Sequence, residues 1–354
     1  MVEVDVIKGK QIYFEIELDE EQILADGIYD LEKIYADMDE AFAVYDCVRG
    51  KKDGKKRIYT RNKDNKDLER LFMAVRMFDR TGWFERYACH YMLYVYDEAE
   101  EDCLEECGIL LRRNFRTRVK EIISDMEKVP GDVPYDDTIK KFLLDTSYQC
   151  IEEDEFILFC KKDFANYDTG VRLMSVSLDR CQTVGIAALI CLMQKNELPD
   201  SVIVAFLKHA DEKRQGIHKL VKLLKKTQRT YRAIELDITT TGWEDGCDYT
   251  VENCFLTPRM YKKLVSVLHH GRGNWKIIPK DRQMLKGILF FDKYFSTSAP
   301  RGENCDYYQE MGVNCFSYCL PVKRNIKEGE RITIDVHRLG WYMFILIKLA
   351  KDSL

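Results

Sequence analysis

The thirteen cysteines constrain this chain most, because their arrangement excludes a fold held together by disulfides. Their number is odd, their spacings are irregular, and no Cys-x-x-Cys occurs. Many stand among apolar neighbours, as Cys89 and Cys191 do, which is typical of thiols packed as small hydrophobic side chains. Residues 1–6 alternate acidic and apolar side chains and show no secretion signal. We therefore predict a cytoplasmic protein with reduced cysteines.

Length and charge set the size of the core and the range of partners. A chain of 354 residues with 46% hydrophobic side chains is long enough for roughly two domains. The net charge of -5 gives no general attraction to nucleic acid or to membranes. The longest apolar run, residues 184–193, is about half of what a membrane span requires, so we expect no membrane partner.

Periodicity predicts an α+β fold, with helical N-terminal and middle regions, β-hairpins and a β-richer C-terminal third. Asp19 is expected to cap a helix, and Asp53-Gly54 to turn a hairpin. Further helices are predicted over 83–107 and 201–209, and strands over 231–239 and 341–349. The proline pair Pro130 and Pro134 divides a domain over 1–129 from a second over 135–354, helical over 135–228 and β-rich over 229–354.

Two segments carry most of the local positive charge. Residues 49–66 contain nine Lys or Arg and two acids, and residues 208–232 contain the same numbers. Such segments are typical of phosphate-binding surfaces, although a solvated hairpin tip or helix face has the same composition. The candidate basic-patch residues are Lys51, Lys52, Lys55, Lys56, Arg57, Lys219, Lys222, Lys225 and Lys226. They favour an intracellular interaction or regulatory protein with a protein or nucleic-acid partner.

Other side chains offer candidate metal ligands and acidic pairs. Cys305, Cys315 and Cys319 cluster in the sequence and could contribute to a zinc site, but buried thiols are the favoured interpretation without a Cys-x-x-Cys pair. Glu235-x-Asp237 resembles half of a nuclease carboxylate set, without the lysine that such nucleases place next. We interpret this pair as a chance pattern.

The segment 291–298, Phe-Asp-Lys-Tyr-Phe-Ser-Thr-Ser, supports an alternative function. With an arginine before it and a Glu-x-Glu after it, it resembles the Arg-Ser-Glu class of ADP-ribosyltransferases. The resemblance covers about a third of the chain, residues 229–354. It implies NAD as cofactor, held by the arginine, and a glutamate that stabilises the oxocarbenium-like transition state. The residues concerned would be Arg232, Ser296, Thr297, Ser298, Glu328 and Glu330. Otherwise no cofactor is indicated.

Overall fold

A computed structural model describes residues 12–51, 53–61, 73–78, 81–95, 98–130, 135–161, 171–208, 213–226, 231–271, 273–278, 304–325 and 331–351. The chain forms two compact units, which we call the N-terminal unit (Met1–Arg113) and the C-terminal unit (Asn114–Leu354). The predicted linker lies mostly outside the described residues, so the predicted domain boundary stays a prediction.

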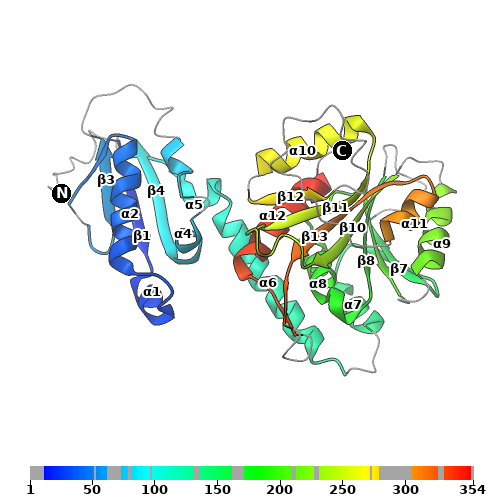
Figure 1. Ribbon diagram of the computed structural model, residues 1–354. Coiled ribbons are helices and arrows are strands. Elements are labelled where there is room, and N and C mark those ends of the chain that lie inside the picture. Colours follow the sequence, from blue (N-terminus) through cyan, green and yellow to red (C-terminus); the bar gives the residue numbers. More distant parts are fainter. Residues whose placement is uncertain are drawn as a thin grey trace. The chain divides into compact units, whose positions relative to one another are not determined.

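The N-terminal unit contains one antiparallel sheet of order β2-β3-β1-β4-β5 (Figure 1). Its strands are β1 (Ile12–Leu18), β2 (Cys47–Arg49), β3 (Arg57–Arg61), β4 (Ala88–Val95) and β5 (Glu98–Asp102). Its helices are α1 (Glu20–Asp26), α2 (Leu31–Val44), α4 (Gly82–Tyr87) and α5 (Cys103–Glu106). Alternate residues of β1, such as Phe14 and Ile16, face a core shared with Phe42 and Phe84.

Two local signals of this unit, the Asp19 cap and the Asp53-Gly54 turn, are confirmed. The Asp19 carboxylate accepts a hydrogen bond from the backbone N–H of Gln22 at 2.9 Å and so caps α1. Gly27 ends that helix with φ of 60°, a left-handed conformation that favours glycine. Asp53-Gly54 lies between β2 and β3, which pair as the expected hairpin.

The C-terminal unit contains an eight-stranded mixed sheet of order β12-β11-β13-β10-β8-β9-β7-β6. The strands are β6 (Gln149–Glu152), β7 (Phe156–Cys160), β8 (Val171–Ser177), β9 (Val202–Leu207), β10 (Tyr231–Thr239), β11 (Tyr249–Phe255), β12 (Trp275–Ile278) and β13 (Asn314–Pro321). A separate pair consists of β14 (Lys323–Asn325) and β15 (Arg331–Thr333). The central strands β13, β10, β8 and β9 are parallel, whereas β7 and β11 run antiparallel to their central neighbours.

Helices cover both faces of this sheet (Figure 1). The larger core packs one face against α6 (Ile109–Glu127), α7 (Asp136–Leu143), α8 (Thr183–Gln194), α10 (Pro258–Gly271) and α12 (Val336–Lys351). The smaller core packs the other face against α9 (Lys213–Lys225) and α11 (Asn304–Glu310). A short 3-10 helix, η2 (Arg180–Gln182), follows β8. None of the helices in the described parts of the chain is long and apolar enough to span a membrane.

The chain mixes helices and strands as expected, but the predicted distribution is not confirmed. Strands occur in both units, and the larger sheet has the helix-covered parallel centre of an α/β fold. The predicted helix over 83–107 contains β4 and β5, and the predicted helix over 201–209 is β9. The predicted strand over 341–349 lies within α12. Both β9 and α12 are buried around most of their surface, which removes the periodicity that separates the two structures.

Candidate functional site

The carboxyl ends of β8 and β10 form the most unusual polar region of the C-terminal unit. After β8 the chain passes through α8 to β9 on one side, whereas after β10 it passes to β11 on the other side. The connections thus leave these neighbouring strands in opposite directions. In open α/β sheets, ligands bind at the carboxyl end of such a switch point.

Carboxylates reach this edge because of the pleat of β10. Leu236 and its apolar neighbours on alternate positions of β10 face the larger core, while Ala233 faces the smaller one. Glu235 and Asp237 share the face of Ala233, since side chains two residues apart point the same way. Glu235 is 3% exposed, and Asp237 is partly buried. A charged residue so deep in a sheet requires a specific partner or a shifted protonation state.

Glu235 lies among neutral hydrogen-bonding groups. Its register neighbours are Ser175 on β8 and Ser317 on β13. Asn304, the first residue of α11, donates from Nδ2 to Glu235 Oε1 and to Ser177 Oγ, the latter at 3.2 Å. Glu235 Oε2 is buried without a hydrogen-bond partner among the described residues. Burial, with a smaller contribution from the charge of Asp237, raises the pKa of Glu235 to about 8.

Gln182, the last residue of η2, contacts the same part of β10. Its Nε2 donates to Asp237 Oδ1, which also accepts from the backbone N–H of Ile238 at 2.7 Å. While the amide nitrogen is committed to Asp237, the Gln182 Oε1 atom is buried without a hydrogen-bond partner among the described residues. We call Glu235, Asp237, Gln182 and Asn304 the β8/β10 corner.

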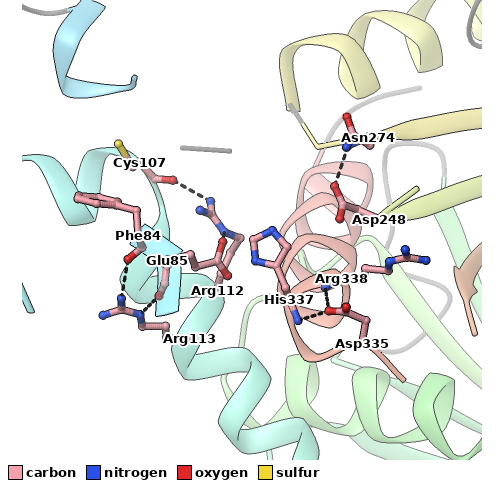
Figure 2. Close-up of polar contacts among 10 residues, drawn as sticks. All are labelled: Phe84, Glu85, Cys107, Arg112, Arg113, Asp248, Asn274, Asp335, His337 and Arg338. Atoms are coloured by element: carbon pink, nitrogen blue, oxygen red, sulfur yellow. Dashed lines mark hydrogen bonds and ion pairs between the residues drawn. The ribbon is translucent and has the colours of Figure 1, made fainter. Parts of the chain in front are cut away.

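The loops around the sheet are fixed by polar contacts that Figure 2 shows. Asp335 Oδ1 accepts from the backbone N–H groups of His337, at 2.8 Å, and Arg338, at 3.2 Å, and so caps the start of α12. Asp248 Oδ2 accepts from the backbone N–H of Asn274 at 2.7 Å. In both contacts a carboxylate accepts hydrogen bonds from backbone N–H groups, which is a structural role. Glu235 differs, because its hydrogen-bond donor is the side-chain amide of Asn304.

Of the residues of the transferase prediction, the structure describes Arg232. Arg232 is the second residue of β10, next to Arg172 and Asn314 in register and toward the opposite end of the strand from Asp237. Burial lowers its pKa. The remaining residues lie outside the described residues: Ser296, Thr297, Ser298, Glu328 and Glu330.

Several lysines of the basic patches are paired within the fold. Lys56 Nζ lies 2.9 Å from the buried carboxylate of Glu15, and Lys55 lies 3.6 Å from Glu21. Lys219 binds Glu155. Arg57 lies over the ring of Tyr35, and Lys225 donates to the Met311 carbonyl. The exposed members are Lys51, Lys222 and Lys226, and Lys52 lies outside the described residues.

The candidate metal-binding cysteines are buried on β13 and α11. Cys305 Sγ lies 3.2 Å from Ser317 Oγ, and Cys315 Sγ donates to the Cys305 carbonyl at 3.1 Å. Burial raises the pKa of Cys305 and of Cys319. Within the described ranges, no group of three His, Cys, Asp or Glu side chains is placed to hold a metal ion. Cys305, Cys315 and Cys319 are buried free thiols, and zinc binding stays the less favoured, untested alternative.

Sequence reasoning noticed Glu235 and Asp237 but set them aside, and it missed Gln182 and Asn304. The pair was compared with a nuclease pattern, which it does not fit. The useful signal was physical instead, because two acids interrupt an otherwise apolar strand at positions on one face. Asn304 could not be found in this way, since it lies 69 residues from Glu235 in the sequence.

Comparison with known proteins found similarity in structure only. No family model matches the sequence, and no curated protein matches it. A mutant of tomato leucine aminopeptidase is 11% identical with a TM-score of 0.40, covering 70% of this chain and 64% of that one. The Bacillus subtilis protein YXEP, described as a dinuclear metal-binding peptidase of the M20 family, is 12% identical with a TM-score of 0.41, covering 67% and 98%. A protein of methicillin-resistant Staphylococcus aureus, described as an aminohydrolase, is 8% identical with a TM-score of 0.42, covering 67% and 96%.

These comparisons correct the functions predicted from sequence. The similar structures are peptidases and an aminohydrolase, so the resemblance to ADP-ribosyltransferases is wrong. The predicted interaction or regulatory role, with nucleic acid as a partner, is wrong for the same reason. The chain spans just under two thirds of the length of the tomato enzyme.

Proposed function

We propose that the C-terminal unit is an enzyme that performs acid–base chemistry on a small polar substrate at the β8/β10 corner, with Glu235 as the group that carries the proton. The supporting observation is a buried carboxyl group at a switch point whose pKa is raised to about 8. A general acid or base works best when its pKa lies near the working pH. Strongly shifted pKa values are typical of functional sites.

The surroundings of Glu235 favour a donor role at neutral pH. With a pKa of about 8, roughly 90% of the Glu235 side chains are protonated at pH 7. Asn304 holds Oε1, so the proton resides on Oε2, the oxygen without a partner among the described residues. In an amide hydrolysis, water would add to the carbonyl carbon and the C–N bond would break as Glu235 gives its proton to the leaving nitrogen. The Glu235 carboxylate would then recover a proton from the added water.

Amide hydrolysis is the first reaction to assay, because its leaving nitrogen requires a proton and Glu235 Oε2 can supply one at neutral pH. The full chain would be tested with aminoacyl p-nitroanilides, starting with L-leucine. We expect turnover that falls at least about 100-fold in Glu235→Gln, the usual size of a general acid or base effect. Glu153→Gln, an exposed substitution in the same unit, is the control and should be unchanged.

Infrared spectroscopy tests the proton on Glu235 independently of the substrate. A carboxylic-acid carbonyl band should be present at pH 6, disappear with a midpoint near pH 8, and be missing in Glu235→Gln. The proposal is wrong if this band is missing from the unsubstituted protein, or if the substitution leaves turnover unchanged. It is equally wrong if no amide is hydrolysed.

A further inference from the structure

Two buried oxygen atoms in the β8/β10 corner have no hydrogen-bond partner among the described residues. They are Glu235 Oε2 and Gln182 Oε1. A buried polar atom without a partner destabilises the fold, so native proteins rarely keep one without a reason. Gln182 of η2 donates to Asp237, and Asp237 shares one face of β10 with Glu235, so both oxygen atoms belong to side chains close to Asp237. Their placement indicates a ligand that supplies hydrogen-bond donors.

Among the described residues, negative charges predominate around the corner. Burial, followed by Asp179 and Asp237, raises the pKa of Cys181 to about 12, which shows that both carboxylates act on this region. Among the described residues, Lys213 is the positive group that acts on Cys181 and on Glu235. These described groups supply two carboxylates and one ammonium group when Glu235 is protonated. A donor that also carries positive charge therefore fits best.

We infer that the β8/β10 corner binds the ammonium or guanidinium group of a small organic cation, with Glu235 Oε2 and Gln182 Oε1 as acceptors, and that the cation displaces the Glu235 proton. The inference takes the location of the site from the proposed function, on which it rests, and adds the chemical class of the ligand. A cation next to Glu235 stabilises the carboxylate, so the proton leaves to solvent as the cation binds.

Glu235 is the group able to exchange its proton in this way. The titratable groups that act on it or feel its charge come from four elements: Asp237 on β10, Lys213 on α9, Cys305 and Tyr308 on α11, and Cys319 on β13. Burial raises the pKa of the two thiols and of the Tyr308 hydroxyl, so all three stay neutral. The pKa of the Glu235 carboxyl is raised into the neutral range.

Isothermal titration calorimetry of the full chain tests the exchange directly. n-Butylammonium and agmatine would be titrated in two buffers of different ionisation enthalpy, with 1-butanol as the uncharged control. We expect both cations to bind and to release about 0.9 proton at pH 7 and about 0.1 at pH 9, as a pKa near 8 requires. 1-Butanol should not bind.

Substitutions separate the two acceptors. Glu235→Gln should weaken cation binding at least about 10-fold and abolish proton release. Gln182→Met should weaken binding while proton release per bound cation is retained, because Glu235 is intact. Glu153→Gln should match the unsubstituted protein. Binding without proton release would overturn the inference, as would no binding, or binding of Zn²⁺ or Mg²⁺ with the organic cations inactive.

The outcome also distinguishes this inference from the proposed function. If organic cations fail to bind but Glu235→Gln abolishes amide turnover, the ligand class is wrong and the catalytic role of Glu235 stands. If cations bind with proton release but no amide is hydrolysed, the corner is a binding site and the proposed enzyme activity is wrong.

Discussion

In the N-terminal unit the carboxylate of Glu85 is buried against a guanidinium group, whereas in the C-terminal unit the carboxyl group of Glu235 is buried against the neutral amide of Asn304. Glu85 Oε2 accepts from Arg112 Nε at 3.0 Å, and Arg112 Nη1 donates to the Cys107 carbonyl at 2.8 Å (Figure 2). The Glu85 and Arg112 side chains are 1% and 0% exposed. This buried charge is neutralised within the fold.

Glu235 receives a hydrogen bond from an amide and, among the described residues, no ion pair with a cation, and so its charge is suppressed by protonation. The difference shows two ways in which a fold tolerates a buried acid. An ion pair such as Glu85–Arg112 is inert because each charge satisfies the other. A carboxyl group that stays neutral only through its pKa remains responsive to pH and to ligands.

The largest expected effect is the pH dependence that Glu235 gives the C-terminal unit. Because its folded-state pKa is raised above the unfolded value of 4.5, the folded state binds more protons between pH 4.5 and 8. Stability therefore falls as pH rises through this window, by up to about 5 kcal/mol, and then levels off. In Glu235→Gln this loss should disappear. The loss of stability is measured by urea unfolding at pH 5 and pH 8.5, followed by hydrogen exchange in residues 171–208.

A rise in stability with pH would contradict the contrast between Glu85 and Glu235. If the unsubstituted protein gains stability between pH 5 and pH 8.5 relative to Glu235→Gln, then Glu235 is ionised in the folded state like an ordinary paired carboxylate.

The ion pair of the N-terminal unit gives the next largest effect. Arg112→Met leaves the Glu85 carboxylate buried without its guanidinium, and should destabilise this unit by about 3–5 kcal/mol. The double variant Glu85→Leu with Arg112→Met should recover most of that loss, because both charges are removed together. Hydrogen exchange of residues 88–95 in the full chain measures both changes.

Lys55→Met is the matched control for Arg112→Met in the same unit, since its partner Glu21 is exposed and surface pairs contribute little. If the double variant is as unstable as Arg112→Met, shape rather than charge compensation explains the cost.

Sequence patterns predicted elements whose signals are local and failed where burial erases periodicity. The Asp19 cap, the Asp53-Gly54 turn and the strand 231–239 all depend on residues within a few positions of one another. The strand Val202–Leu207 is buried at every position and so reads as an unbroken apolar run. The apolar run over 341–349 has the same appearance, yet forms a helix in α12.

The candidate site could be predicted only in part. Glu235 and Asp237 are visible as acids on one face of an apolar strand, but their depth depends on the strands and helices packed around them. The contact of Asn304 with Glu235 depends on where the chain places α11 after a long excursion. No local pattern carries that information, because it is set by the order of strands in the sheet.

Asn304 provides a smaller and sharper test of the corner. Its hydrogen bond favours the charged form of Glu235, so Asn304→Leu should raise the Glu235 pKa further, by about one unit. The midpoint of the infrared carboxylic-acid band measures this shift. Tyr308→Phe is the control on the same helix, since its hydroxyl donates to Ser175 at 2.9 Å rather than to Glu235. Equal shifts in the two variants would mean that α11 acts by general packing.

The smallest expected effects come from two helix caps, one in each unit. They allow the stability of the two units to be compared at sites that involve no buried charge. Asp30 Oδ1 accepts from the Lys33 backbone N–H at 3.0 Å in the N-terminal unit, and Asp335 caps α12 in the C-terminal unit. Asp30→Ala and Asp335→Ala should each destabilise their own unit by about 1 kcal/mol, and the Asn substitutions by much less. Hydrogen exchange of α2 and α12 would report the losses. If removal of these equivalent caps lowers the unfolding free energy of the two units by different amounts, the units differ in stability. The contrast between Glu85 and Glu235 would then reflect that difference as well as charge compensation. Each pH or substitution effect would have to be compared with the stability of its own unit.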